Sequence, residues 1–235
     1  MDRPADIPLP VDRHLDLGCG KRPRNPYDRT ELCGTDVRAL SPGDDFDGRK
    51  VDYRPANLIL DPIPWADDSF GAVSAFDFIE HVPRLIVAPG GGETWFPFVR
   101  LMDEVWRVLA PGGRFYALTP AYPSPEAFQD PTHVNIITEK THEYFCGERP
   151  LGRIYGFRGH FRVLRAAWVD QPRHFSAIPS DPPAPPAEPV AAHRRLAHAV
   201  RDGLRVLRGR RVIDRPPPQV YFLWELEAVK PTPRA

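Results

Sequence analysis

The sequence predicts an α/β fold built around a mostly parallel sheet. Short apolar runs alternate along the chain with longer segments whose apolar residues recur at helical spacing. This alternation is typical of parallel strands joined by helices. The first apolar run opens directly into Gly18-Cys19-Gly20. Paired glycines after a buried strand allow a tight turn and a close approach of the backbone to a ligand.

Seven strands are expected in this sheet, with one clear helix between the fourth and the fifth. The helix covers residues 94–109, where apolar side chains share one face, and Pro111-Gly112-Gly113 is expected to end it. Because parallel strands are buried on both sides, we expect helices on both faces of the sheet. The strands are expected at residues 11–17, 32–37, 51–53, 70–76, 114–119, 161–169 and 220–229.

Residues 179–218 are expected to form an insertion before the last strand. Six prolines fall within residues 179–189, which excludes a helix or a central strand there. Residues 190–211 carry aliphatic side chains at helical spacing and are rich in arginine. We interpret this stretch as a basic helix that contacts an anionic partner, or that packs on its own domain or on a second copy in a homodimer.

Composition limits the class of protein. The 235 residues suit one elaborated domain, and 31 Lys+Arg balance 31 Asp+Glu, which argues against a dedicated nucleic-acid binder. The three cysteines form no C-x-x-C motif, and no apolar run approaches the ~20 residues of a membrane span. Residues 1–8 lack the pattern of a signal peptide. We therefore expect a cytoplasmic protein with reduced thiols and no transmembrane segment.

Five short motifs follow one another between residues 11 and 120, about half of the chain. They are Leu15-Asp16-Leu17-Gly18-Cys19-Gly20, then Asp36, the Pro64-x-x-Asp67-x-Ser69-Phe70 run, Glu80-His81 and Leu109-x-Pro111-Gly112-Gly113. In this order and spacing they resemble class I S-adenosylmethionine-dependent methyltransferases of the broad group called type 11. One departure is Arg22, which stands where the family pattern has a third glycine.

The resemblance implies a Rossmann-like, seven-stranded sheet whose last strand is antiparallel, in a single domain spanning residues 1–235. Residues 11–120 would form the cofactor-binding core, and residues 121–160 a loop and helix on the substrate side. The implied cofactor is S-adenosylmethionine. The implied cofactor contacts are Asp16, Gly18 and Gly20 at the methionine and ribose, Asp36 at the ribose hydroxyls, Asn57 and Leu58 at the adenine, and Phe76 and Asp77 along the methionine side. Taken one at a time, these residues also have a purely structural interpretation: glycines after a strand are often only a turn, and acidic or amide side chains often cap helices or form turns.

Residues 130–134, Asp-Pro-Thr-His-Val, resemble a segment of small methyltransferases that modify sugars and polysaccharides. This resemblance implies a saccharide hydroxyl as the acceptor, for example the 1-hydroxyl of methylmannose polysaccharide. A hydroxyl is a weak acid, so a base must take its proton. His133, oriented by Asp130 or another carboxylate, is the first candidate because a neutral imidazole suits the task. The acceptor alternatives are another small metabolite, or no acceptor at all in a chain that only binds cofactor.

Further side chains near these motifs widen the candidate site. His81 is the second candidate for the base and Asp77 the third, and either histidine also suits a purely structural role. An oxygen-rich set of ligands for Mg²⁺ is offered by five of these side chains, Asp77, Glu80, His81, Asp130 and His133. The glycines at 90–92, followed by aromatic residues at 95 and 96, suit a lid over a sugar or a plain connection.

Overall fold

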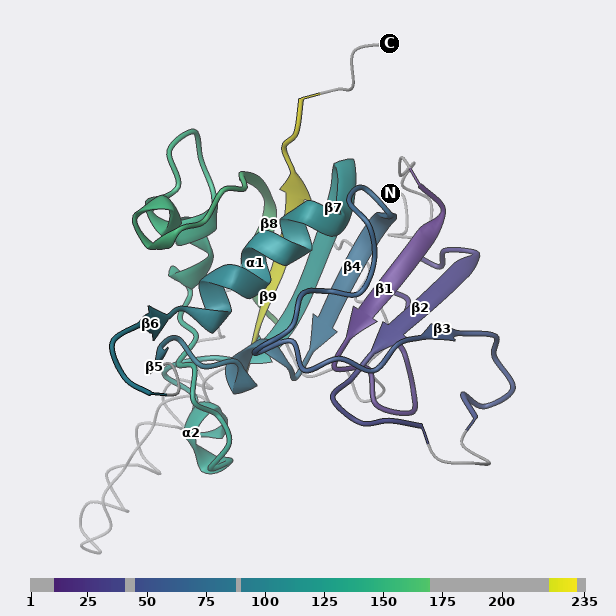
Figure 1. The fold of residues 1–235 in the computed structure, drawn as a ribbon, viewed down its shortest axis with the longest axis horizontal. Coiled ribbons are helices and arrows are strands. Elements are labelled where there is room, and N and C mark those ends of the chain that lie inside the picture. Colours follow the sequence, from purple (N-terminus) through teal and green to yellow (C-terminus); the bar gives the residue numbers. More distant parts are fainter. Residues whose placement is uncertain (1–10, 41–44, 88–89, 170–219, 232–235) are drawn as a thin grey trace, which may run out of the picture.

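A computed structural model describes residues 11–40, 45–87, 90–169 and 220–231 of the chain. Its seven-stranded sheet has the order β3-β2-β1-β4-β7-β9-β8 (Figure 1). Strands β1 to β4 and β7 run parallel, and β9 is antiparallel to both of its neighbours, β7 and β8. The expected sheet with an antiparallel last strand is confirmed. The strands are β1 (Arg13–Leu17), β2 (Glu31–Thr35), β3 (Asp52–Tyr53), β4 (Phe70–Phe76), β7 (Leu109–Pro120), β8 (Phe161–Val169) and β9 (Tyr221–Ala228).

The remaining elements are short and lie between β4 and β8. Strands β5 (Ile86–Val87) and β6 (Thr94–Trp95) form a small antiparallel hairpin. The helices are α1 (Pro97–Val108) and the single turn α2 (Glu126–Gln129). Three 3₁₀ turns complete the described chain: η2 (Ile79–His81), η3 (Thr141–Phe145) and η4 (Leu151–Tyr155).

Helix α1 is the helix expected from the apolar spacing. Pro97 occupies its first turn, where a missing N–H costs nothing, and its apolar side chains are buried against the sheet. The expectation that Pro111-Gly112-Gly113 ends the helix is wrong. The helix ends at Val108, Leu109 is already extended, and β7 runs from Leu109 through the Pro-Gly-Gly residues. The pairing of β4 with β7 shifts register there, which absorbs the turn residues as an irregularity in the strand.

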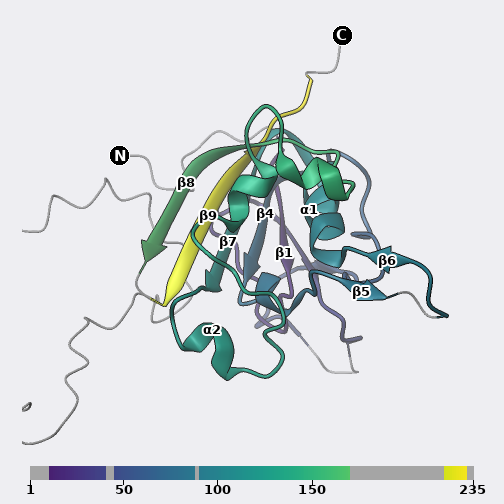
Figure 2. The ribbon, with the colours of Figure 1, turned by 90° about the vertical axis from the view of Figure 1, so that its left-hand side faces the viewer.

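The central strands of the sheet are buried on both faces, whereas the edge strand β8 is mostly exposed or half-buried. The larger core cluster lies on the α1 face, and Figure 2 shows α1 and the β5–β6 hairpin on one side of the strands. Alternate residues of β4, β7 and β9 point to the second cluster on the other face. That cluster contains Tyr27, whose hydroxyl donates to buried Glu225 at 2.8 Å, and Arg114 contacts the same carboxylate at 3.2 Å.

The expectation of helices on both faces does not hold for the described ranges. The loop of residues 18–30 contributes Tyr27 to the second face, and no helix is assigned to that loop. Pro23 and Pro26 explain the loop, because each lacks an N–H and clashes with the preceding helical turn. Within the described part of the chain, no helix combines the length and apolarity needed to cross a bilayer. The expected insertion at residues 179–218 lies outside the described residues.

Candidate cofactor and acceptor site

The candidate site lies at the carboxyl edge of the parallel strands, where β1, β2, β4 and β7 end together (Figure 1). The loop after β1 turns through two glycines in the left-handed region, Gly18 at φ +62° and Gly20 at φ +55°. A methyl group added at Gly18 would lie 2.5 Å from Cδ2 of Phe78. The loop is therefore pressed against the residues that follow β4, and only glycine fits at that turn.

The residues expected to hold an adenosine come together at the ends of β1, β2 and β3. The backbone N–H of Gly20 donates to Oδ2 of Asp36 at 3.1 Å, and Arg38 Nε donates to Oδ1 at 3.0 Å. Partial burial opposes ionisation of Asp36, but these hydrogen bonds outweigh it and hold its pKa below the usual value. Ala56 N–H donates to the Asp36 carbonyl at 3.0 Å, which brings the Asn57 turn beside the acidic residue.

Asp16 is placed differently from the expected cofactor contact. Its side chain is fully buried, accepts a hydrogen bond from Ser74 at 2.6 Å and another from the Arg24 N–H at 2.8 Å. Ser74 also meets Nε2 of buried His14 at 2.8 Å. Burial raises the pKa of Asp16 to about 7 against these hydrogen bonds, and lowers the pKa of His14 to about 3. Through its hydrogen bond from the Arg24 N–H, the buried Asp16 side chain holds the loop that follows β1.

The Phe76 side chain is likewise turned into the protein. It is only 2% exposed, belongs to the second core cluster and packs on the Tyr116 ring. Leu58 is buried in the main cluster. Contacts of either residue with a cofactor would therefore come from the backbone. Asp77, the next residue, has φ +48° and is partly exposed, and burial raises its pKa against a hydrogen bond from Tyr221.

Beyond β4 the turn η2 carries Glu80 and His81 toward the loop after β7. Glu80 is 1% exposed, and one of its oxygens accepts a hydrogen bond from Thr119 at 2.8 Å. Its other oxygen, Oε1, is buried without a hydrogen-bond partner among the described residues. Burial is the main cause that raises the pKa of Glu80 to about 8, and the carboxylates of Asp77 and Asp130 add to it.

The two candidate histidines meet across this edge. The rings of His81 and His133 pack edge to face with centroids 4.8 Å apart. His81 Nδ1 lies 2.9 Å from the Thr132 hydroxyl and 3.3 Å from the Thr132 carbonyl. A carbonyl only accepts, so in the neutral imidazole Nδ1 carries the hydrogen and Nε2 the lone pair. The Thr132 hydroxyl in turn donates to Asp130 at 2.7 Å, so the expected aspartate orients His81 through this hydroxyl.

His133 has looser contacts. Its side chain is 10% exposed, with Nε2 4.0 Å from Oδ2 of Asp130. Its Nδ1 is buried without a partner among the described residues. Ligand atoms of Glu80, His81 and His133 all lie within 4.8 Å of one another. Three of the five expected metal ligands therefore meet. The two imidazoles make this set poorer in oxygen than the sites that Mg²⁺ prefers.

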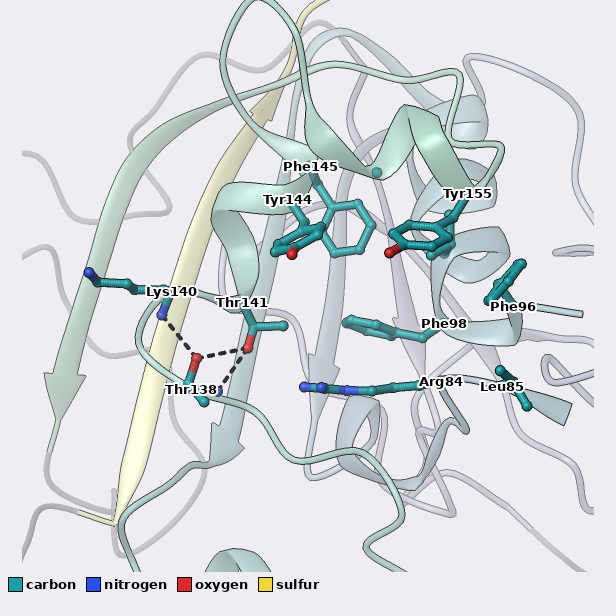
Figure 3. A pocket seen from close by; sticks show the side chains of 12 residues that line it. Arg84, Leu85, Phe96, Phe98, Thr138, Lys140, Thr141, Tyr144, Phe145 and Tyr155 are labelled. Atoms are coloured by element: carbon teal, nitrogen blue, oxygen red, sulfur yellow. Dashed lines mark hydrogen bonds between the residues drawn. The ribbon is translucent and has the colours of Figure 1, made fainter.

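A pocket of about 510 Å³ lies between α1, the β5–β6 hairpin and the turns η3 and η4 (Figure 3), and none of the expected cofactor-binding or catalytic residues lines it. Aromatic rings line it, with Phe96 and Tyr155 5.2 Å apart. Figure 3 shows Arg84 pointing along the pocket beneath Phe98. The Arg84 Nε donates to Asn135 at 2.7 Å, and the Asn135 N–H donates to the Glu80 carbonyl at 2.9 Å. These bonds connect the pocket to the histidine edge.

Sequence reasoning missed several partners of the expected residues. His14 and Ser74 interrupt apolar strands, and His14 precedes Asp16 by two positions, which places both on one face of β1. That period of two was an available signal. Thr132 and Phe78 gave no such signal, because their partners, His81 and Gly18, lie far away in the sequence.

No family model matches the sequence, and no curated protein matches it. Solved structures do match the fold. A methyltransferase dependent on S-adenosylmethionine from Mesorhizobium loti has 14% identity and a TM-score of 0.50, covering 92% of this chain and 90% of its own. A counterpart from Archaeoglobus fulgidus has 15% identity and a TM-score of 0.50, covering 92% and 85%. A chain from the complex of the Haloferax volcanii Trm112 methyltransferase activator with its candidate methyltransferase has 15% identity and a TM-score of 0.50, covering 94% and 86%. The chain therefore has the fold of class I methyltransferases.

Proposed function

We propose that this chain is an S-adenosylmethionine-dependent O-methyltransferase whose acceptor is a saccharide hydroxyl. One observation carries the proposal: two chemically different groups of residues meet at one edge of a class I methyltransferase sheet. A glycine loop joined to Asp36 suits an adenosine-containing cofactor. Histidines beside carboxylates, beyond β4 and β7, suit removal of a proton from a hydroxyl.

The cofactor would lie over Gly18 and Gly20, with its ribose hydroxyls donating to Asp36. Arg38 now donates a hydrogen bond to that carboxylate. The Arg38 side chain is 66% exposed, so it can turn into solvent when a ribose takes its place at Asp36, whose own side chain is 11% exposed. Asn57 would face the adenine. The loop supports this cofactor over a dinucleotide, because the third glycine of that fingerprint is replaced by Pro23.

The reaction is a direct displacement. The acceptor oxygen attacks the methyl carbon, the bond from carbon to sulfur breaks, and S-adenosylhomocysteine leaves with the electron pair. The enzyme positions the two reactants and accepts the hydroxyl proton. His133 is the proposed base, close to the carboxylate of Asp130. His81 is the alternative, since its Nε2 lone pair is available, and Asp77 is the third choice.

The acceptor class is supported by the pocket that Arg84 and Asn135 link to Glu80. Its aromatic rings offer flat apolar faces, and Thr138, Thr141, Tyr144 and Tyr155 offer hydroxyls for hydrogen bonds. A volume of about 510 Å³ is within the usual range for small-molecule sites. Methylmannose polysaccharide remains one specific candidate acceptor. Mg²⁺ forms no part of the proposal.

The cofactor assignment is tested by calorimetric titration with S-adenosylmethionine. We expect one binding site and a loss of affinity of at least about tenfold in Asp36→Ala, since a hydrogen bond to a charged group contributes about 1.5–3 kcal/mol. The matched control is Asp67→Ala, an exposed aspartate in the loop that enters β4 at the opposite edge. Equal affinity in both variants would overturn the ribose assignment.

The acceptor assignment is tested by a screen that measures released S-adenosylhomocysteine over free and methylated mono- and oligosaccharides. Activity on phenols or carboxylates alone would reject a saccharide acceptor. Cofactor binding without transfer to any acceptor would favour a chain that only binds cofactor. On the best acceptor, His133→Ala should lower turnover by about 10²–10⁴-fold with little change in cofactor affinity. Equal losses in both would remove His133 from the chemistry.

A further inference from the structure

Three side chains that commonly bind metal ions converge from two separate segments of the chain. Glu80 and His81 come from η2, and His133 comes from the loop after β7. Ligand atoms of all three lie within 4.8 Å of one another. Two of the groups, Glu80 Oε1 and His133 Nδ1, are buried with no hydrogen-bond partner among the described residues. Buried polar atoms in folded proteins are almost always paired, so two such atoms in one cluster call for an explanation.

We propose that Glu80, His81 and His133 bind one divalent transition-metal ion. Two imidazoles and one carboxylate with open positions form a donor set that suits Zn²⁺, Fe²⁺ and their neighbours in the first transition row. The ion would occupy the lone pairs that the structure leaves unused. It would also supply positive charge beside a buried carboxylate whose strongest charged neighbours are two further carboxylates, Asp77 and Asp130.

The outer contacts of two of the three residues, His81 and Glu80, match those of metal ligands. His81 donates its Nδ1–H to the Thr132 carbonyl and hydroxyl, which leaves Nε2 for an ion. Glu80 is held at its other oxygen by Thr119. Ligating histidines usually donate their second N–H to a carbonyl or carboxylate in this way, and ligating carboxylates are themselves hydrogen-bonded.

The ligand atoms of the three residues are somewhat farther apart than they would be around a bound ion. Bonds of about 2.1 Å to a divalent ion hold adjacent ligand atoms roughly 3–3.4 Å apart, so binding would draw ligand atoms that now lie within 4.8 Å together by up to about 1.8 Å. The backbone bond from Asn135 N–H to the Glu80 carbonyl fixes the two segments side by side. The adjustment therefore falls on side chains, and the edge-to-face contact of the two imidazoles shows that they already meet.

This inference goes beyond the proposed function, and only its catalytic consequence rests on that function. With the ion bound, His133 is a ligand and not a free base. Glu80, His81 and His133 would then hold an ion whose chemistry is to make the acceptor hydroxyl more acidic, and Asp77, the third candidate base, would accept the hydroxyl proton. The site lies beside the glycine loop, because Phe78, which packs on Gly18, directly precedes η2.

The test is calorimetric titration of the full chain, first treated with chelator and then dialysed, with Zn²⁺ alone and with Mg²⁺ alone. We expect one Zn²⁺ per chain and affinity for Mg²⁺ at least about a hundredfold weaker. Cobalt(II) added in place of zinc should give visible absorption bands of a nitrogen- and oxygen-ligated ion. His81→Ala, His133→Ala and Glu80→Gln should each weaken Zn²⁺ binding more than tenfold. The control, His160→Ala, removes a partly exposed histidine outside the cluster and should bind as the parent chain does.

The metal site would be overturned if the parent chain did not bind Zn²⁺. It would also be overturned if both His81→Ala and Glu80→Gln still bound Zn²⁺ as the parent chain does. Circular dichroism shows whether each variant is folded, and His81→Gln provides a milder variant whose unchanged Zn²⁺ binding would have the same meaning. Titration of the same samples with S-adenosylmethionine separates the two proposals. Cofactor binding without metal overturns only this site, whereas metal binding without cofactor overturns only the proposed function.

Discussion

Replacing Gly18 by alanine adds one methyl group at the turn that follows β1. At φ +62° an L-residue costs about 1–2 kcal/mol. The new Cβ would also lie 2.5 Å from Cδ2 and 2.9 Å from Cγ of Phe78, well inside van der Waals contact. Phe78 packs on the main core cluster, so its displacement carries an overpacking cost of about 1–3 kcal/mol. The free energy of unfolding should therefore fall by about 2–5 kcal/mol.

Urea unfolding followed by circular dichroism measures this loss, and two other glycines provide matched controls. Gly48 has φ +73° and no atom within 4 Å of an added Cβ, so Gly48→Ala reports the backbone cost alone. At Gly20 the added Cβ would lie 3.1 Å from the flexible end of Arg38. Gly20→Ala should therefore resemble Gly48→Ala, whereas Gly18→Ala should lose about 1–3 kcal/mol more.

The excess cost at Gly18 should disappear when the ring is removed. In a double-mutant cycle with Phe78→Ala, the added methyl group no longer meets the ring, and only the backbone cost remains. The contact between the glycine loop and η2 would be refuted if Gly18→Ala were no less stable than Gly48→Ala. It would also be refuted if the excess persisted without Phe78.

Three further outcomes can be measured. Burial raises the pKa of Asp16 to about 7 from 3.8, so the folded chain keeps a proton that the unfolded chain loses. Stability should thus fall by on the order of 4 kcal/mol as the pH rises from about 4 to 7, and an unchanged slope in Asp16→Asn would contradict this. Tyr27→Phe should cost about 1–3 kcal/mol in thermal unfolding because buried Glu225 loses a donor, and a loss below about 0.5 kcal/mol would argue against that role. Thr132→Val should lower turnover by about 10–100-fold at constant cofactor affinity, since His81 loses the hydroxyl that orients it; full activity would exclude that role.

Local patterns predicted the strands and the helix closely. Residues 70–76 and 161–169 form β4 and β8 with the expected bounds, and the helix expected at 94–109 is α1. These elements follow from apolar periodicity, which acts over a few residues. The connections were harder to predict. Pro-Gly-Gly after α1 is a common helix stop, yet pairing of β7 with β4 carries the strand through it.

The candidate site likewise has one part that could be predicted from the sequence and another that depends on tertiary packing. The glycine loop and Asp36 could be found in the sequence, because each directly follows a strand and the order of parallel strands brings their ends together. The burial of Asp16 and Phe76 could not be found, since a residue at a strand end faces either a ligand or the core according to what packs above it. Here Arg24 and Ser74 occupy the space around Asp16.

The sequence by itself therefore determined the sheet, the position of the glycine loop and the acidic residue that accompanies it. Those features depend on spacing within one strand and the turn after it. Only the tertiary structure decided that Glu80, His81 and His133 share one cluster, and that Phe78 closes on Gly18. Such contacts join segments far apart in the chain, and their geometry is fixed by the packing of whole strands and loops against one another.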